Sequence, residues 1–223
     1  MGNFKDNNES NYRREMEGLV TWCNENNLSL NVSKTKELII DFRKKGRKHA
    51  PIYINRNEVE RAKSIKFLGV TITDNVSWTS YIDTTIKKAQ QHFFFLSRLR
   101  KFGMSIRSQT NFYRCTTERI LSRCKMAWYG NCSALDCKKL QKVMCTAQTI
   151  TEANLPSMDS IYLAHCRGKA ANIIKDPSHP SNDLLQPFLS GRRYRSLNAC
   201  TSSFSNSFCP AVMILMNRVS RLK

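Results

Sequence analysis

Residues 79–102 read TSYIDTTIKKAQQHFFFLSRLRKF, and this stretch decides the fold because the hydrophobic pattern changes its period here, directly after Trp78. Upstream of it, short apolar segments are separated by polar ones, as strands are. From residue 79 onward, apolar side chains recur at the spacing of helices. We therefore predict a helix over residues 79–102, followed by three more over residues 105–128, 133–153 and 157–175.

The N-terminal part predicts one helix and four short strands. Residues 9–27 carry apolar side chains at helical spacing, with charged residues between them. The segments that follow are short, rich in β-branched residues and bounded by polar turns. They are residues 28–32, 37–42, 52–54 and 65–73.

The ends of the later helices are marked by capping and breaking residues. Ser133 and Asp136 resemble a capping box, in which a serine hydroxyl binds a backbone N–H at the start of a helix. Gly103 and Gly130 stand where helices are expected to end. Pro156 separates the last two helices, because proline cannot continue a helix.

These patterns predict an α+β fold. A small antiparallel β-sheet with an N-terminal helix is followed by a helical bundle and by a weakly ordered basic tail. We place the domains at residues 1–78, 79–175 and 176–223, because residues 176–181 (DPSHPS) form a turn-rich linker.

The charge is strongly basic. Lys and Arg number 36 against 17 Asp and Glu, which gives a formal net charge of +19. Residues 1–100 hold 18 basic and 11 acidic side chains, and residues 101–223 hold 18 basic and 6 acidic ones. Such a field attracts polyanions, because each neutralised phosphate releases counterions. RNA or DNA, bound through phosphate without sequence specificity, is the predicted partner, and a generally basic protein without a specific partner is the alternative.

Nine cysteines form an odd number, and MGNFKDNNES at the start lacks the apolar core of a signal peptide. We therefore expect reduced thiols in an intracellular protein, cytoplasmic or nuclear. No apolar stretch is long enough to suggest a membrane span. Cys132 and Cys137 make one loose pair, and His165 and Cys166 are adjacent, whereas structural zinc requires close pairs on both sides. We predict no metal and no cofactor.

Several segments resemble the reverse transcriptases of LINE-type (non-LTR) retrotransposons. Residues 22–42 are similar to the stretch that follows the catalytic aspartate pair, and residues 67–78 to the primer-grip hairpin. Residues 88–103 with 111–129 are similar to the helical thumb, and residues 172–196 to the region beyond the thumb. The resemblance implies a partial palm in residues 1–78 and a thumb-like region in residues 79–175. These segments are WCNENNLSLNVSKTKELIIDF (22–42), FLGVTITDNVSW (67–78), residues 88–103 with 111–129, and NIIKDPSHPSNDLLQPFLSGRRYRS (172–196).

Polymerisation in that family requires carboxylates that hold two Mg²⁺ ions. The resemblance implies that they would lie before Glu9, where the sequence has Asp6, and no adjacent Asp-Asp pair occurs in the chain. We therefore expect an inactive remnant of an RNA-directed DNA polymerase, with no catalytic residues and residual affinity for nucleic acid.

Two further groups are candidate nucleic-acid contacts on the strength of the resemblance. Lys34 and Lys36 match a lysine near the incoming nucleotide, and the alternative is exposed turn lysines. Phe67, Leu68 and Gly69 match the primer grip, where glycine lets another backbone approach closely. The alternative is a hairpin that packs its apolar side chains, Phe67, Leu68, Val70 and Ile72, into the core.

Basic runs supply the remaining candidates. Interleaved aromatic residues such as Phe102, Tyr113 and Tyr194 could stack on bases, although such residues more often lie in a core. A dense basic loop over residues 43–49 is expected to stay solvated unless phosphate is near. The predicted phosphate-binding residues are Lys87, Lys88, Arg98, Arg100, Lys101, Arg192, Arg193 and Arg195.

Residues 22–42 also resemble the N-terminal domain of the eighth AlkB homologue, an enzyme of alkylation repair and tRNA modification. That resemblance implies association with a 2-oxoglutarate-dependent oxygenase or a methyltransferase. A facial iron triad requires His-x-Asp and a distant His, and none of the four histidines is in that pattern. A third hypothesis is a protein-interaction module or relic without affinity for nucleic acid, whose partner protein covers an open strand edge.

Overall fold

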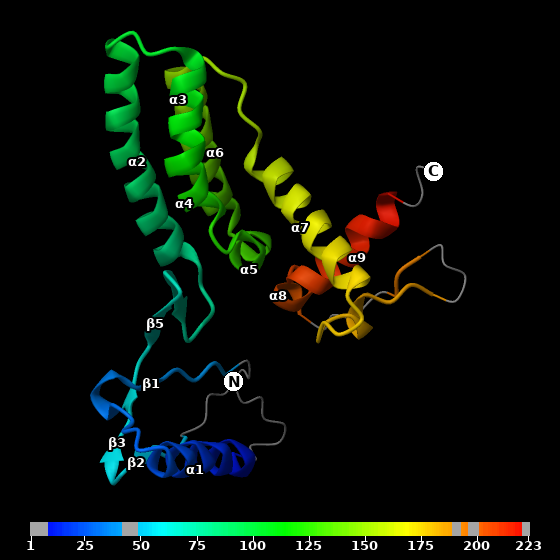
Figure 1. Cartoon of the computed structure of the whole chain (residues 1–223). Helices are drawn as coiled ribbons and strands as arrows, with labels where there is room; N and C mark the ends of the chain where they lie inside the picture. The colour runs from blue at the N-terminus through cyan, green and yellow to red at the C-terminus, as the bar shows by residue number, and fades with distance from the viewer. Residues whose placement is uncertain (1–8, 42–48, 189–192, 196–200, 220–223) are drawn as a thin grey trace. The chain divides into compact units, whose positions relative to one another are not determined.

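The computed structural model describes residues 9–41, 49–188, 193–195 and 201–219 (Figure 1). The chain divides into two compact units, Met1–Ser77 and Trp78–Lys223. Among the described residues, the first unit holds three two-stranded sheets and the second is built from helices. The predicted α+β class is confirmed.

The first unit is organised around helix α1 (Ser10–Glu25), which lies within the helix predicted over residues 9–27. A small apolar core is formed by Ile52, Ile54 and Val59. Strands β2 (Tyr53–Ile54) and β3 (Asn57–Glu58) pair in antiparallel fashion, and β1 (Lys36–Glu37) pairs in parallel with β4 (Glu60–Arg61). The side chains packed against this core are Tyr12, Met16, Val20, Leu30 and Val32.

The strands are shorter than expected. The strand predicted over residues 28–32 is absent, because the Asn31 side chain accepts a hydrogen bond from the Lys34 N–H and starts the 3₁₀ turn η1 (Val32–Lys34) instead. Of the strand predicted over residues 37–42, β1 retains Glu37, and Phe42 lies outside the described residues.

The strand predicted over residues 65–73 is a hairpin, β5 (Ser64–Phe67) and β6 (Val70–Thr73), with Leu68 and Gly69 at its turn. Both turn residues have positive φ, +48° and +81°, as a two-residue type I′ turn requires. Glycine adopts this conformation freely, whereas leucine adopts it at a cost.

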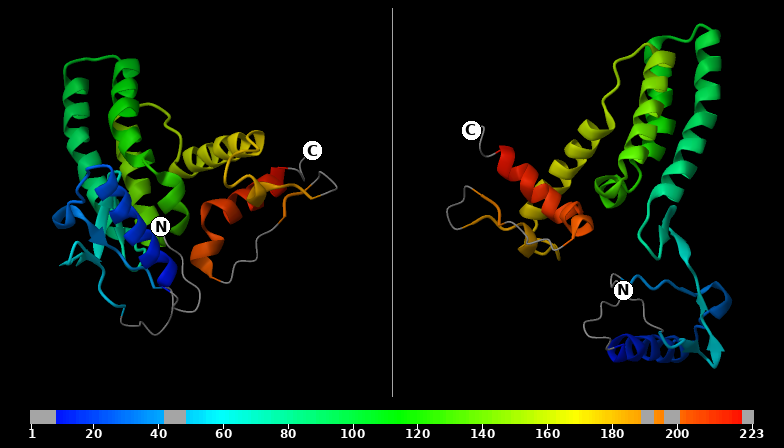
Figure 2. Two further views of the ribbon diagram at one scale, coloured as in Figure 1. Left: turned by 60° about the horizontal axis from the view of Figure 1, so that its bottom comes forward. Right: turned by 180° about the vertical axis from the view of Figure 1, so that it is seen from behind.

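The second unit begins with helix α2 (Thr79–Lys101), which packs beside α3 (Ile106–Tyr113) and α6 (Ala134–Thr151) (Figures 1 and 2). The predicted cap at Ser133 is confirmed, since its hydroxyl accepts a hydrogen bond from the Asp136 N–H at 3.1 Å. The core face of α2 is formed by the buried side chains of Tyr81, Ile82, Thr85, Ala89, Phe93 and Leu96.

The helix predicted over residues 105–128 is interrupted. After α3 the chain makes a π-helical turn, Arg114–Glu118, then α4 (Arg119–Ser122) and α5 (Lys125–Trp128), with Cys124 at φ +48°. The Arg123 carbonyl accepts hydrogen bonds from Trp128 Nε1 at 2.8 Å and from the Tyr81 hydroxyl at 3.4 Å. In a continuous helix, the Arg123 carbonyl would accept a hydrogen bond from a backbone N–H four residues later. Here the two side chains are its donors instead, which accounts for the break.

The C-terminal region differs from the predicted weakly ordered tail. Helix α7 (Met158–Lys175) packs against α9 (Phe208–Val219), whose Val212 and Met213 are buried. The short α8 (Ser202–Ser205) precedes α9. Residues 201–207 (TSSFSNS) are polar and give no helical pattern, whereas burial of α9 against α7 stabilises the helix that follows them.

Gly130 lies where the C-terminal region approaches the turn after α5. A Cβ atom at this position would meet the backbone oxygen of Asn206 well inside contact distance, and the Tyr162 hydroxyl at 3.1 Å. We expect Gly130→Ala to lower the free energy of unfolding by about 1–3 kcal/mol, because backbone must move to admit the methyl group. Urea denaturation followed by circular dichroism measures this change.

Gly168 in α7 is the matched control. A Cβ atom there meets nothing within 4 Å, so Gly168→Ala should instead raise the free energy of unfolding by about 0.5–1 kcal/mol. Equal effects of the two substitutions would contradict the close approach of Asn206 to Gly130.

Candidate nucleic-acid interface

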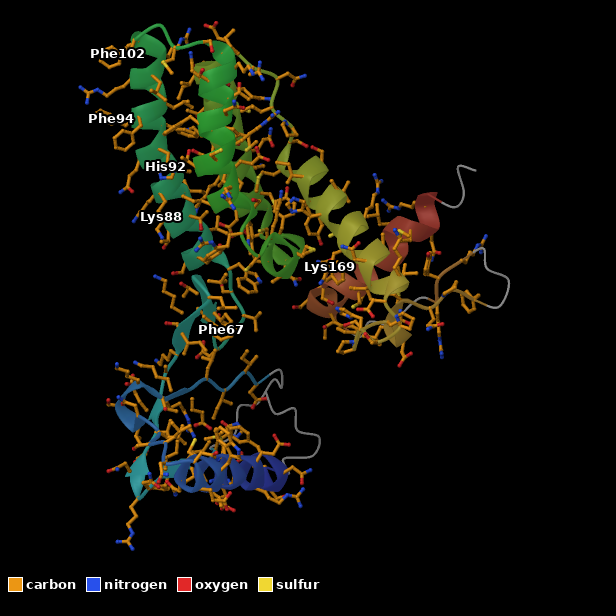
Figure 3. All side chains as sticks on the ribbon, viewed as in Figure 1. Phe67, Lys88, His92, Phe94, Phe102 and Lys169 are labelled. Atoms are coloured by element: carbon orange, nitrogen blue, oxygen red, sulfur yellow. The ribbon has the colours of Figure 1, made fainter. Side chains whose placement is uncertain are left out.

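The exposed face of α2 carries both cations and aromatic rings. Lys87 and Lys88 are exposed, as are three phenylalanines: Phe94 is 59% exposed, Phe95 54% and Phe102 79%. In Figure 3, Phe94 and Phe102 project from the side of α2 that faces away from α3. We call Lys87, Lys88, Phe94, Phe95, Arg98 and Phe102 the α2 face.

Helical periodicity explains why these residues share a side. Lys88, Phe95 and Phe102 follow one another at intervals of seven residues, which is nearly two turns. Phe93 and Leu96 take the buried positions of the same helix. The run of three phenylalanines is therefore divided, with Phe93 in the core and the other two at the surface.

The rings of the α2 face contact each other and a cation. The centroids of Phe94 and Phe95 lie 5.6 Å apart in an edge-to-face arrangement. The guanidinium carbon of Arg98 lies 5.3 Å from the centroid of Phe94. Such cation–π contacts contribute about 0.5–1 kcal/mol at exposed sites, enough to bias these side chains toward one arrangement.

The charge of this region is all of one sign. Between Asp83 and Glu118 the sequence contains no acidic residue, and the intervening 34 residues include seven basic ones. A surface of this kind has a positive potential that neighbouring carboxylates in the same stretch do not reduce. The seven are Lys87, Lys88, Arg98, Arg100, Lys101, Arg107 and Arg114.

Arg100 has a different role from its neighbours. Its guanidinium forms an ion pair with Glu152 and donates a hydrogen bond to the Thr149 carbonyl at 3.1 Å. It therefore connects the C-terminal ends of α2 and α6. Lys101, next to it, is exposed.

The other predicted candidates are divided between the units. In the first unit, Lys34 is exposed in η1, and Lys36 forms an ion pair with Glu60 at 2.8 Å. In the second, Arg193 and Arg195 are exposed on either side of Tyr194. Arg192 and residues 43–48 of the basic loop lie outside the described residues.

The hairpin tip exposes its apolar residues. Phe67 is 59% exposed and Leu68 77% exposed, whereas Val70 is buried. The alternative that Phe67 and Leu68 pack into the core is therefore wrong. Because the turn reverses the chain at Leu68 and Gly69, the Leu68 side chain lies at the tip, outside the paired strands.

Tyr113, a predicted stacking residue, is fully buried instead. Its hydroxyl donates a hydrogen bond to Met144 Sδ at 3.1 Å, and burial raises its pKa above the ordinary value. Sequence reasoning also missed Phe94 and Phe95. The phase set by Ala89, Phe93 and Leu96 would have identified both as surface residues.

A buried lysine lies apart from the α2 face. Lys125 is 1% exposed, donates a hydrogen bond to the Met158 carbonyl and lies 4.7 Å from the Tyr129 ring centroid. Burial lowers its pKa from 10.5 to about 8, against the opposing charge of Asp159. The Tyr129 hydroxyl donates to Asp159 at 2.9 Å.

No group of three or more His, Cys, Asp or Glu side chains that could hold a metal ion occurs in the described part of the chain. The eight cysteines of that part are free thiols. Burial raises the pKa of Cys132 to about 12. Among the helices whose residues are described, none combines the length and the apolar character needed to cross a bilayer.

Comparison with known protein families matches part of the second unit. Residues 78–118 are similar to the family described as "Alkylated DNA repair protein alkB homolog 8, N-terminal". No curated protein and no solved structure matches the chain. The match covers α2 and α3 and does not include residues 22–42, so our placement of the AlkB resemblance there was wrong. The resemblance to LINE-type reverse transcriptases finds no support in these comparisons.

Proposed function

We propose that the chain binds nucleic acid through α2 and the start of α3, and that it does so without catalysing a reaction. The observation that carries this proposal is the 34-residue stretch with seven basic residues and no acidic one, whose cations stand on an exposed helix face beside exposed phenylalanines. Phosphate groups are the chemical partner that such a surface favours, because binding releases the counterions condensed on the polyanion.

The similarity over residues 78–118 supports the same part of the chain. The matching family carries the name of a DNA-repair protein, and the match contains the whole α2 face. We propose that the shared property is contact with nucleic acid. The proposal assigns neither oxygenase nor methyltransferase chemistry to these residues, and an accessory role beside an AlkB-type enzyme is compatible with it.

A fragment of a retrotransposon reverse transcriptase is a second candidate. The observation that favours it is the exposed tip of the β5–β6 hairpin, where Phe67 and Leu68 are available to a primer strand or to a partner protein. Leu68 occupies a positive-φ position, at a cost of about 1–2 kcal/mol that a glycine would avoid. Photocrosslinking from position 68 to a primer–template duplex would support this candidate, and crosslinking to protein alone would favour an interaction module.

The proposal is tested by the salt dependence of binding. We expect the purified chain to bind a labelled primer–template duplex and single strands, with log affinity falling linearly with log salt concentration. The double substitution Lys87→Gln and Lys88→Gln should reduce the slope by about 1.5, because each phosphate contact contributes roughly 0.7–0.9. Fluorescence anisotropy over a series of salt concentrations measures both quantities.

The matched control removes two charges from another helix. Arg167 and Lys169 are exposed on α7, where Figure 3 labels Lys169. Their replacement by glutamine changes the net charge by the same amount. The slope of this control should stay close to that of the unmodified chain. Equal losses in both variants would mean that net charge, and not α2, governs binding. No binding at low salt by folded protein would refute the proposal.

A further inference from the structure

We infer that the α2 face binds the unpaired bases of a single-stranded nucleic acid, by stacking them on Phe94, Phe95 and Phe102. This inference rests on the proposed function and names its ligand. It is carried by the exposed rings, their spacing along α2 and the cations between them.

Folding does not require these three rings. Tyr81, Ile82, Ala89, Phe93 and Leu96 already form the core face of α2, and the three phenylalanines lie on other sides of the helix. A phenylalanine left in water forgoes about 1.5–3 kcal/mol of burial. Three of them within nine residues form an apolar patch, and such patches on a surface mark binding sites.

The spacing places cations and aromatic rings in two neighbouring rows along the helix. Lys88, Phe95 and Phe102 form one row along the helix, in which successive members are about 10 Å apart at a rise of 1.5 Å per residue. Lys87, Phe94 and Lys101 form a second row with the same interval. A strand lying along α2 would meet cations for its phosphates and rings for its bases side by side, the combination that proteins use to bind single strands.

Stacking selects the single strand over the duplex. In a duplex, bases follow at 3.4 Å along each strand and cover one another's faces, so a protruding ring reaches only edges, sugars and phosphates. Unpaired bases expose a π-face that any aromatic side chain can contact. Arg98 adds a planar guanidinium beside Phe94, a second surface on which a base can stack.

The same charge argues against a second copy of the chain as the occupant. In a two-fold symmetric pair the same patch lies on both sides of the interface. Two α2 faces would then oppose Lys87, Lys88 and Arg98 with their equivalents, without an acidic residue from residues 84–117 to compensate them. A single-stranded nucleic acid, by contrast, has phosphates that neutralise the cations and bases that cover the phenylalanines.

The test compares a 16-nucleotide single strand with the duplex of the same sequence, using the full chain. In the variant Phe94→Leu, Phe95→Leu, Phe102→Leu, the side chains stay apolar but lose their π-faces. We expect its affinity for the single strand to fall roughly tenfold or more and its affinity for the duplex to change less than about twofold. Quenching of 2-aminopurine in the single strand reports stacking directly and should be lost in the variant.

Phe188→Leu is the matched control, since Phe188 is exposed in the same unit but outside the α2 face, and it should change neither affinity. If both ligands bind equally and the triple variant leaves both unchanged, stacking is refuted while the proposed function stands. If neither ligand binds at low salt, the proposed function itself fails. If sedimentation shows that the unmodified chain dimerises and the triple variant does not, the face is a protein interface and the inference is overturned.

Discussion

Replacing Asp136 by alanine should lower the free energy of unfolding of the second unit by about 2–4 kcal/mol, because two hydrogen bonds to its buried carboxylate are lost and two hydroxyl donors lose their acceptor. Asp136 is buried at the first turn of α6. Its carboxylate accepts hydrogen bonds from the Ser133 hydroxyl at 2.7 Å and from the Thr79 hydroxyl at 3.0 Å. Its other oxygen lies 3.7 Å from Lys139 Nζ, which also binds Asp83 at 2.7 Å.

One side chain thus joins the start of α2 to the start of α6. Alanine would leave the Ser133 and Thr79 hydroxyls without this acceptor, and unsatisfied partly buried groups are costly. Urea denaturation monitored by the fluorescence of the buried Trp128 measures the loss.

Two variants separate the contributions to this effect. Thr79→Val removes one hydrogen bond and should cost about 1 kcal/mol. Asp136→Asn keeps the shape of the side chain and should fall between Thr79→Val and Asp136→Ala. A loss of 1 kcal/mol or less in Asp136→Ala would show that Asp136 does not tie the two helices together.

Lys125→Met should make the second unit more stable relative to the unmodified chain, and this advantage should depend on pH. The pKa of Lys125 is lowered to about 8 in the folded chain from 10.5, chiefly by burial. Below pH 8 both folded and unfolded chains are protonated, and the full cost of burying the charge is present. Between pH 8 and 10.5 the folded chain holds fewer protons, so this cost disappears as the pH rises.

The size of the expected change in stability follows from the shift in the pKa of Lys125. A difference of 10.5 − 8 = 2.5 pKa units corresponds to about 3 kcal/mol. The stability advantage of Lys125→Met should therefore decrease by about that amount from pH 8 to pH 10.5. Raised pKa values of Tyr129 and Cys132 also change stability above pH 9, but they are present in both proteins and largely cancel in the difference.

Denaturation curves of both proteins at intervals from pH 7 to 11 provide the measurement. A constant difference across this range would show that the Lys125 charge carries no burial cost. A difference that grows with pH would mean that the pKa of Lys125 is raised, and not lowered, in the folded chain.

The parts of the fold that the sequence predicts are those fixed by local interactions. The helices α2, α6 and α7 begin within one residue of the predicted positions. For α6 and α7 the start is fixed locally, because the hydroxyls of Ser133 and Ser157 accept hydrogen bonds from N–H groups three residues away. The break at Cys124 could not be predicted in this way. It depends on the Tyr81 and Trp128 side chains reaching the Arg123 carbonyl, and Tyr81 belongs to a different helix.

Strands were predicted less well for the same reason. Pairing between β1 and β4 joins residues 24 positions apart, and it is supported by ion pairs of Lys36 with Glu60 and Arg61 with Glu37. Neither strand has the apolar alternation that marks a half-buried strand. A pattern-based reading therefore extends strands where apolar residues are dense, as in residues 37–42, and overlooks charged ones.

The candidate site was recovered in part. Lys87, Lys88 and Arg98 were identified from charge alone and are exposed on α2. Arg100 belongs to the same basic run, yet its position on the helix directs it to Glu152. Charge density predicts the region, and helical phase decides which cation pairs with a carboxylate of a neighbouring helix.

The bond between Thr79 and Asp136 spans 57 residues of sequence, and this separation has a consequence for the order of folding. During synthesis α2 is complete well before α6 leaves the ribosome. Until α6 packs against α2, the side chains of Phe93 and Leu96 are exposed to solvent, as those of Phe94 and Phe95 are. In that interval the helix exposes apolar surface on several sides at once. Exposed apolar surface of this kind makes a nascent chain prone to aggregation. A product truncated before residue 134 should therefore collect in the insoluble fraction.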